Sequence, residues 1–394
     1  MNDDDVVIVS SARTPMGGFQ GSLSAATGVD LGATAIRAAV ERAGLPPETV
    51  DEVIMGCVLP AALRQAPARQ AMRQAGLPDA TGAVTINKVC GSGLKAAMFA
   101  TDMLRAGSNG IMVAGGMESM TNAPYLLTRA RSGQRMGHGE MLDSMFTDGL
   151  EDAETGRAMG TFAQETADAH QIGREEMDAF AVTSLERARR AQESGAFDAE
   201  IAPVTLKTRR GEETVSVDEQ PAKADPAKIP TLKPAFRRDG TVTAANSSSI
   251  SDGAAALVLA TGRAARERGL VPLARVVGHA THSQLPAEFT LAPVGAISGL
   301  LGKLGWSADE VDLYEINEAF AMVTMLATRE LGLDPERVNI HGGACALGHP
   351  IGASGARILV TLLAALEHTG GRRGIASLCI GGGEATALAV ERIG

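Results

Sequence analysis

A basic surface and a long hydrophobic segment are both missing from this sequence, and each absence excludes a class of protein. The 36 Lys and Arg residues are outnumbered by 46 Asp and Glu residues, which gives a formal net charge of -10 and an isoelectric point near 5.3. Nucleic acids and anionic membranes attract proteins through basic surfaces. The longest apolar run near the C-terminus, residues 358–366, is far shorter than the roughly 20 residues that cross a bilayer. We therefore expect neither a nucleic-acid partner nor a membrane span.

Cysteine is also scarce, and its positions exclude the common metal sites. The four cysteines, Cys57, Cys90, Cys345 and Cys379, have no Cys-x-x-Cys or other metal-ligand spacing. The chain begins Met-Asn-Asp-Asp-Asp, without the positively charged start and apolar stretch of a signal peptide. These features predict reduced thiols in a cytoplasmic protein without a metal site.

The composition is typical of an α/β protein with close backbone packing, since 45% of the 394 residues are apolar and 46 are glycine. This length exceeds what one hydrophobic core normally organises, so we expect two or three compact units. Near the N-terminus, β-prone runs alternate with a helical pattern that begins at Asp30 as N-cap and stops at Gly44. The pattern predicts a buried parallel or mixed sheet covered by helices, with strands at residues 6–10, 50–56, 85–89 and 111–114.

Residues 121–250 differ from this pattern and resemble an insertion. They hold a Gly-rich and charged stretch at residues 129–139, a polar helix at residues 175–193 and a Pro/Lys segment at residues 220–234. Solvated surface loops and a cover over a substrate site are both consistent with this composition.

After residue 270 the first pattern returns, and three segments match earlier ones in the same order. Residues 50–54 resemble residues 311–315, the turn at 90–93 resembles that at 349–355, and residues 115–118 resemble residues 381–384. Ordered self-similarity of this kind predicts a duplicated half, although Gly-rich turns also match by chance. Two related halves place equivalent loops around one site.

Two turns carry residues that are suited to catalysis. Cys90 follows a β-prone run and precedes an Ala-rich helix, and a helix N-terminus with a basic partner favours the thiolate by lowering the pKa of a thiol. A cysteine here also fits a small core residue. His349 lies beside Pro350 in a Gly-rich turn before another helix, where a base or hydrogen-bond donor is one interpretation.

Two further segments add polar groups of lower specificity. Cys379 ends a β-prone run and is followed by Gly381 to Gly383, whose backbone N–H groups can form an oxyanion hole or belong to a simple turn. Asn317 lies at a strand-to-helix junction, where asparagine is usually an N-cap.

Together these segments resemble the thiolase family along essentially the whole chain. The matching stretches are residues 87–93, 115–120, 246–253, 317–320, 348–350 and 379–381. The resemblance implies a duplicated, layered α-β-α-β-α fold with an inserted loop domain. We expect residues 1–120 plus 251–270 to form the N-terminal half and residues 271–394 to form the C-terminal half. Residues 121–250 are expected to form the inserted loop domain. This domain covers coenzyme A and substrate and makes oligomer contacts. The family assembly is a homodimer or homotetramer.

The resemblance also implies a role for each matched residue. Cys90 is the nucleophile that accepts the acyl group, and His349 takes its proton and later helps to stabilise an enolate oxygen. Cys379 removes or returns the α-proton of the second acyl-CoA. Asn317 holds a water in the enolate hole, while the N–H groups of Cys90 and Gly381 bind the oxyanion of the acyl-enzyme intermediate. No permanently bound cofactor is implied, and coenzyme A is a substrate and product.

Residues for coenzyme A follow from the same resemblance. Ser248 matches the serine that contacts the pantetheine arm, and Lys223 is a candidate for the nucleotide phosphates. Four further positions match the walls of the family's pocket: Leu150, Met159, Ala319 and Phe320.

Two positions depart from the family pattern. Ala158 stands where many biosynthetic members have a histidine, and Phe289 stands where a methionine is common. Both positions flank the acyl pocket in the family. They leave the length and branching of the acyl group open, as the sequence leaves open whether synthesis or degradation in fatty acid metabolism is the physiological direction.

Two other functions compete with a thiolase. A decarboxylating ketoacyl synthase shares the fold and a cysteine nucleophile but lacks the second catalytic cysteine, so Cys379 argues against it. A catalytically inactive relative that binds acyl-CoA or lipid has no need for Cys90, His349, Cys379 and Asn317 together.

Overall fold

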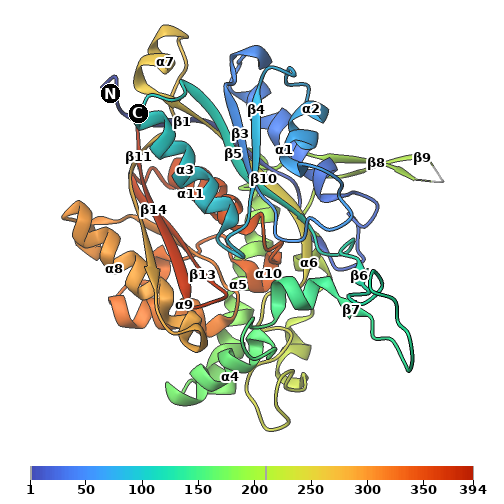
Figure 1. The fold of residues 1–394 in the computed structure, drawn as a ribbon. Coiled ribbons are helices and arrows are strands. Elements are labelled where there is room, and N and C mark those ends of the chain that lie inside the picture. Colours follow the sequence, from blue (N-terminus) through green and yellow to red (C-terminus); the bar gives the residue numbers. More distant parts are fainter. Residues whose placement is uncertain (1, 209–210, 394) are drawn as a thin grey trace.

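A single hydrogen-bonded sheet runs through the protein in the order β12-β13-β14-β11-β1-β10-β5-β3-β4 (Figure 1). The structure is a computed structural model that describes residues 2–208 and 211–393. The N-terminal half of the sheet has β1 (Val6–Arg13), β3 (Glu52–Gly56), β4 (Gly82–Ile86), β5 (Ile111–Ser119) and β10 (Ser251–Thr261), and the short β2 (Gly17–Gly18) pairs with β10. The C-terminal half has β11 (Ala274–Ser283), β12 (Leu313–Ile316), β13 (Arg373–Ile380) and β14 (Glu384–Arg392).

Four strands of each half have the same order and the same directions. β3 is parallel to β5, which is antiparallel to β10, which is antiparallel to β1. The series β12, β13, β14 and β11 repeats these relations. The duplicated α/β fold expected from the sequence is therefore confirmed. A short pairing between β1 and β11, with Val7 opposite Arg275, joins the halves.

One of the three sequence matches behind the duplication was wrong. β3 places Glu52 opposite Met112, and β12 places Leu313 opposite Gly374. Met112 therefore corresponds to Gly374, and the segment after residue 115 does not correspond to residues 381–384. β5 continues through its two glycines, whereas the chain leaves β13 before Gly381 and turns.

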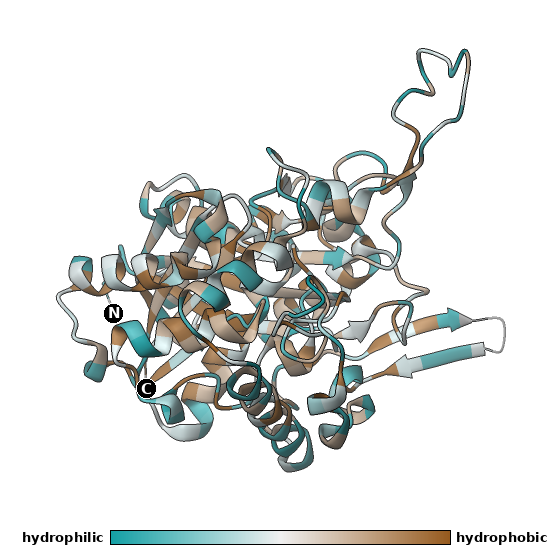
Figure 2. Ribbon diagram, turned by 90° about the horizontal axis from the view of Figure 1, so that it is seen from below, coloured by the Kyte–Doolittle hydropathy of each residue, from teal (hydrophilic) through white to brown (hydrophobic). Residues whose placement is uncertain are grey.

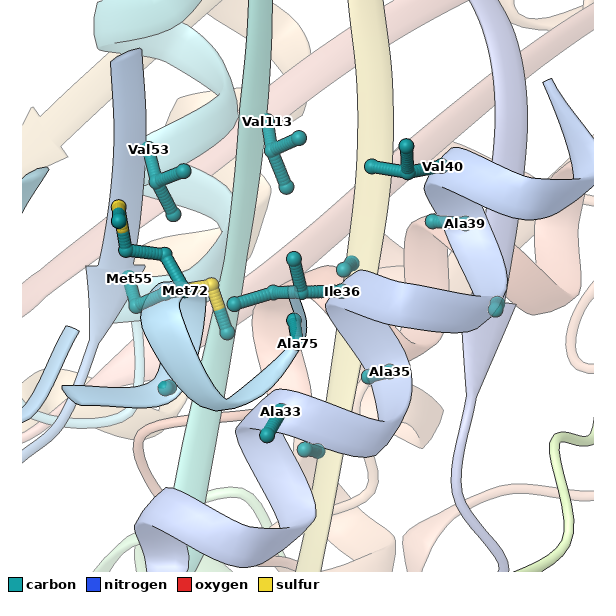
Figure 3. Close-up of a cluster of buried hydrophobic side chains, with 14 of the residues drawn as sticks. Ala33, Ala35, Ile36, Ala39, Val40, Val53, Met55, Met72, Ala75 and Val113 are labelled. Atoms are coloured by element: carbon teal, nitrogen blue, oxygen red, sulfur yellow. The ribbon is translucent and has the colours of Figure 1, made fainter. Parts of the chain in front are cut away.

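Helices form three layers around these strands. The outer face of the N-terminal half is covered by α1 (Gly28–Arg42) and α2 (Pro67–Gln74), whose apolar side chains pack on β3 and β5 (Figure 3). Between the halves lie α3 (Ser92–Arg105) and α11 (Ser354–Thr369), in one hydrophobic cluster with both parts of the sheet. The outer face of the C-terminal half is covered by α8 (Ala292–Leu304) and α9 (Ala321–Leu331).

Residues 121–250 lie to one side of the two halves and include long projecting segments. The elements are β6 (Tyr125–Leu126), β7 (Leu142–Asp143), α4 (Met159–Ala169), α5 (Arg174–Ser194), β8 (Val204–Thr208), β9 (Gly211–Val215) and α6 (Glu219–Lys223). The β8–β9 hairpin and the loop between β6 and β7 extend away from the body (Figure 1), whereas hydrophobic residues concentrate on the inner elements (Figure 2). In the described ranges, no helix is both long and apolar enough to cross a membrane.

The start of α1 and the position of β4 both differ from those expected. Thr27, not Asp30, is the N-cap of α1, because the Thr27 hydroxyl accepts the Asp30 N–H while the Asp30 carboxylate accepts the Thr27 N–H. The strand expected at residues 85–89 lies at Gly82–Ile86 instead. The Asn87 side chain accepts a hydrogen bond from the Val89 N–H, and the Ser92 hydroxyl donates one to the Val89 carbonyl. These bonds form a turn where strand pairing was expected to continue.

Candidate active site

A cavity of about 380 Å³ lies where both halves meet residues 121–250. Its lining includes nine of the residues expected from the sequence: Cys90, His349, Cys379, Gly381, Ser248, Leu150, Met159, Ala319 and Phe320. A wider surface depression of about 850 Å³, lined by charged residues such as Asp51 and Arg105, contains none of them. The smaller cavity is therefore the candidate active site.

Close contact between α3 and α11 brings the turns of Cys90 and His349 together. Each turn lies just before the N-terminus of its helix, and the helices touch at Gly93 and Gly355. A Cβ on Gly93 would lie 2.7 Å from the Ala356 nitrogen, and a Cβ on Gly355 would lie 2.4 Å from the Leu94 nitrogen. Only glycine allows this approach, because real side chains do not come so near to backbone atoms.

The hydrogen bonds of His349 define which ring nitrogen carries the proton. Its Nδ1 lies 2.5 Å from the Ser354 hydroxyl, which donates its own hydrogen to the Pro350 carbonyl at 2.9 Å. With its own hydrogen given to Pro350, the Ser354 hydroxyl accepts a hydrogen bond from Nδ1–H, and Nε2 is then the unprotonated nitrogen. Nε2 is buried without a protein partner in the described residues. Burial, aided by the positive charge of Arg357, lowers the pKa of His349 to about 3, so the imidazole is neutral at physiological pH.

The surroundings of Cys90 favour the thiol over the thiolate, opposite to the effect that a helix N-terminus alone would have. Burial raises the pKa of Cys90 to about 11, although N–H groups of Gly381 and of Cys90 itself act in the opposite direction. The cavity leaves part of the residue accessible, but protein surrounds the sulfur on most sides. Burial also raises the pKa of Cys379, and Cys90 adds to the effect. Both thiols need a proton acceptor before they can react.

This protonation state predicts the pH dependence of Cys90 alkylation. Only the thiolate reacts, and below a pKa of about 11 its fraction increases about tenfold per pH unit. We expect the iodoacetamide alkylation rate of Cys90 to rise with this slope from pH 7 to pH 10 without a plateau. Peptide mass spectrometry after timed quenching measures the rate, and Cys90→Ala gives the background. A plateau below pH 8 would show that the thiolate is already formed at neutral pH.

Two expected site residues do not line the cavity. Asn317 is fully buried, and neither side-chain polar atom has a protein hydrogen-bond partner in the described residues. Lys223 lies on α6, where its ammonium group is paired with Glu219. Glu219 also accepts hydrogen bonds from Gly18 and Ser22, so it holds α6 against the N-terminal half.

The structure adds a buried carboxylate that sequence reasoning missed. Glu118 accepts backbone N–H groups from Val58 and Gly352 at 2.9 Å each and from Leu59 at 3.1 Å. It thus ties the loop after β3 to the turn that carries His349. Burial raises the pKa of Glu118 to about 7, against the effect of these hydrogen bonds. Glu118 falls within a segment matched to the family, but no spacing in the sequence indicates its three backbone partners.

Aromatic side chains form part of the cavity wall. Only nine phenylalanines occur in the chain, and four of them line this cavity: Phe146, Phe236, Phe289 and Phe320. Phe320 makes edge contacts with Phe236 and Phe289, with ring centroids 6.2 and 6.3 Å apart. Ala158 lines the same cavity as the residue before α4. Because only 3% of the residues are aromatic, the phenylalanines could have been singled out from the sequence as candidates for the cavity wall.

Two α/β halves of equivalent topology, with two cysteines and a histidine at one cavity between them, are typical of acyl-transferring enzymes with a duplicated fold. Family models of the thiolase N-terminal domain and the thiolase C-terminal domain match residues 6–263 and 270–392. The chain therefore belongs to the thiolase family.

Individual relatives agree over the full length. Acetyl-CoA acetyltransferase 2 of Arabidopsis thaliana is 49% identical, with 99% of this chain and 98% of the relative covered. Acetyl-CoA acetyltransferase of Pseudomonas aeruginosa is 48% identical, with 98% and 99% covered. The crystal structure of Bacillus anthracis acetyl-CoA acetyltransferase matches with a TM-score of 0.97 at 43% identity, covering 99% of each chain. The Acat5 thiolase from Ascaris suum, crystallised with coenzyme A, matches with a TM-score of 0.93 at 41% identity, covering 99% of this chain and 100% of that one.

Proposed function

We propose that this protein is an acyl-CoA C-acyltransferase. It condenses two acetyl-CoA molecules to acetoacetyl-CoA and coenzyme A, and in reverse it cleaves 3-oxoacyl-CoA by thiolysis. The observation that carries the proposal is the convergence of Cys90, Cys379 and the unprotonated Nε2 of His349 on one cavity of a thiolase-family chain. Relatives named acetyl-CoA acetyltransferase support the same substrate. The second cysteine favours this reaction over that of a ketoacyl synthase.

In the proposed acylation step, the Cys90 sulfur attacks the thioester carbonyl of acetyl-CoA. Its proton passes to Nε2 of His349 and then to the departing coenzyme A thiolate, so charge and protons balance. The N–H groups of Cys90 and Gly381 stabilise the oxyanion of the tetrahedral intermediate. A neutral imidazole is the form that this step requires, and the low pKa of His349 maintains it.

In the proposed condensation step, Cys379 provides the base. Its proton moves to His349, and the resulting thiolate takes the α-proton of the second acetyl-CoA. The His349 imidazolium then faces the enolate oxygen, with a water held by the Asn317 amide as a second donor. The buried amide without a protein partner supports this role. The enolate carbon attacks the acetyl group on Cys90, and the released Cys90 thiolate recovers the proton from His349.

We further propose that coenzyme A enters past the cavity walls formed by Ser248, Leu150, Met159, Ala319 and Phe320. The Ser248 hydroxyl donates to the Ala319 carbonyl at 3.0 Å, which holds both residues in one wall. The CoA complex of the Ascaris suum relative supports binding of coenzyme A. The position of Lys223 gives no support for its contact with the nucleotide phosphates.

The wider organisation is also a proposal. Residues 1–120 with 251–270 form one half, residues 271–394 form the other, and residues 121–250 cover the site. We propose a cytoplasmic homodimer or homotetramer in fatty acid metabolism. Free thiols at the four cysteines support the compartment, and the open outer edge of β4 supports self-association.

A thiolysis assay tests the proposed reaction. Acetoacetyl-CoA and coenzyme A are mixed with the protein, and the loss of the 3-oxoacyl-CoA absorbance is followed. Time-dependent cleavage to acetyl-CoA supports the function. Binding of acetoacetyl-CoA without cleavage would instead identify an inactive acyl-CoA-binding relative.

The two cavity residues that depart from the family pattern, Ala158 and Phe289, predict a graded preference for the length of the acyl group. Ala158 leaves space where a histidine would stand, and Phe289 takes some of it back, so we expect activity on acetoacetyl-CoA and on 3-oxo substrates one or a few carbons longer. One methylene group in an apolar pocket changes the free energy of binding by about 1 to 3 kcal/mol. Substrates of neighbouring chain length should therefore differ in kcat/KM by roughly 10- to 200-fold. Ala158→His should shift the kcat/KM profile toward short chains. Ala199→His, at an exposed alanine outside the cavity lining, is the control. Identical profiles for parent and Ala158→His would contradict this interpretation.

A further inference from the structure

The residue before Cys90 has a backbone conformation that its side chain disfavours. Val89 has φ 46°, in the left-handed region, where a β-branched residue is an outlier. Of the seven non-glycine residues with positive φ among those described, it alone is β-branched. Such a conformation persists only where its surroundings determine it, and it occurs mainly at functional sites.

Hydrogen bonds on both sides of Val89 hold this conformation. The Asn87 side-chain oxygen accepts the Val89 N–H at 2.8 Å. The Ser92 hydroxyl donates to the Val89 carbonyl at 2.6 Å and accepts the Lys88 N–H at 2.8 Å. Ser92 is fully buried, so its hydroxyl has little freedom to seek other partners. The peptide groups that flank Val89 are therefore fixed by side chains at residues 87 and 92.

The Val89 side chain also reaches the opposite turn. A Cβ built on Gly381 would lie 3.7 Å from Cγ1 of Val89. The isopropyl group therefore lies near the backbone of Gly381, whose N–H is one of the groups that lower the pKa of the Cys90 thiol. We call residues 87–92 the Cys90 clamp. Through Val89, this segment couples the orientation of the Cys90 side chain to the position of the Gly381 turn.

We propose that Asn87, Val89 and Ser92 are positioning residues that hold the Cys90 sulfur in line with the Gly381 N–H and the cavity. The left-handed backbone at Val89 turns the chain sharply between β4 and α3, and the two side chains keep it there. This inference rests on the proposed role of Cys90 as nucleophile. A displacement of about 1 Å in a reacting group can cost about 100-fold in rate.

The test separates positioning from folding. Val89→Gly removes the steric conflict and the contact with Gly381, and Asn87→Ala removes the acceptor of the Val89 N–H. Quenched-flow mass spectrometry then measures the acylation of Cys90 over a range of acetyl-CoA concentrations. We expect the maximal acylation rate to fall about 10- to 100-fold in both variants, with the half-saturating concentration within about twofold of the parent value. The thermal midpoint of Val89→Gly should be no lower than that of the parent.

Two controls distinguish this effect from general backbone loosening. Gln171→Gly relieves a similar left-handed residue, with φ 55°, at an exposed position after α4, and should acylate at the parent rate. Asn87→Asp retains the acceptor at an exposed position and should recover most of the rate lost in Asn87→Ala. Parent-like acylation in Val89→Gly and Asn87→Ala would overturn the Cys90 clamp while the proposed function stands. A parent protein that is never acylated at Cys90 would overturn the proposed function itself.

Discussion

Cys90→Ala is expected to lower the rate of acetyl transfer by roughly 10⁴- to 10⁶-fold, because removal of a nucleophile leaves only binding and oxyanion stabilisation. The large effect follows from the geometry of the cavity, where Cys90 lies at the meeting point of two helix N-termini and beside the Gly381 N–H. Incubation with acetyl-CoA, digestion and mass spectrometry should find an acetyl group on the Cys90 peptide of the parent. The same peptide from Cys90→Ala should carry none.

Cys345→Ala provides the matched control for this substitution. Cys345 is also a free, partly exposed cysteine, and its backbone N–H bonds to Glu318, a bond that the variant retains. We expect this variant to be acylated at Cys90 as in the parent. A stable acetyl group on Cys379 with none on Cys90 would reverse the assignment of the two cysteines.

Cys379→Ala is expected to separate the two steps of the reaction. Condensation requires removal of an α-proton, and loss of a general base typically costs about 10²- to 10⁴-fold. Acylation uses only Cys90 and His349, so it should remain within a few-fold of the parent rate. Formation of acetoacetyl-CoA measures the rate of condensation, and quenched acylation of Cys90 measures the rate of acylation. Condensation at the parent rate would require another base.

His349→Asn complements this experiment because it affects both steps. Asparagine keeps a polar side chain in the turn but cannot accept a proton, so acylation and condensation should decline together. The contrast with Cys379→Ala distinguishes Cys379, a base used in condensation alone, from His349, a base used in both acylation and condensation. A His349→Asn variant that loses condensation alone would limit the histidine to the enolate.

The sequence was sufficient for the residues whose chemistry is local. Cys90 and His349 lie in Gly-rich turns and Cys379 lies at the end of a strand before such a turn, patterns that can be recognised within a few residues, and the structure brings all three to one cavity. The alternation of strands and helices likewise depends on local patterns and predicted the α/β sheet, whereas the duplication was predicted from segments that recur in the same order. The N-cap at Thr27 was missed because Thr27 and Asp30 form a reciprocal pair, and either residue alone suits a cap.

The remaining features depend on distant parts of the chain. The raised pKa of Cys90 results from burial beneath segments far away in sequence, which outweighs the helix N-terminus that the sequence reveals. Glu118 holds loops from both halves through backbone N–H groups, which have no sequence signature. Lys223 is chemically suited to phosphate, but its pairing with Glu219 is a property of the folded chain.

The close approach of α3 and α11 at Gly93 and Gly355 also shows where the two halves differ. These glycines occupy equivalent positions in α3 and α11, one in each half. If Ser92 is matched to Ser354, Cys90 corresponds to Gly352 and His349 corresponds to Asn87. The equivalent turns of the two halves thus carry different groups, a thiol in one and an imidazole in the other, and both groups line a single asymmetric cavity.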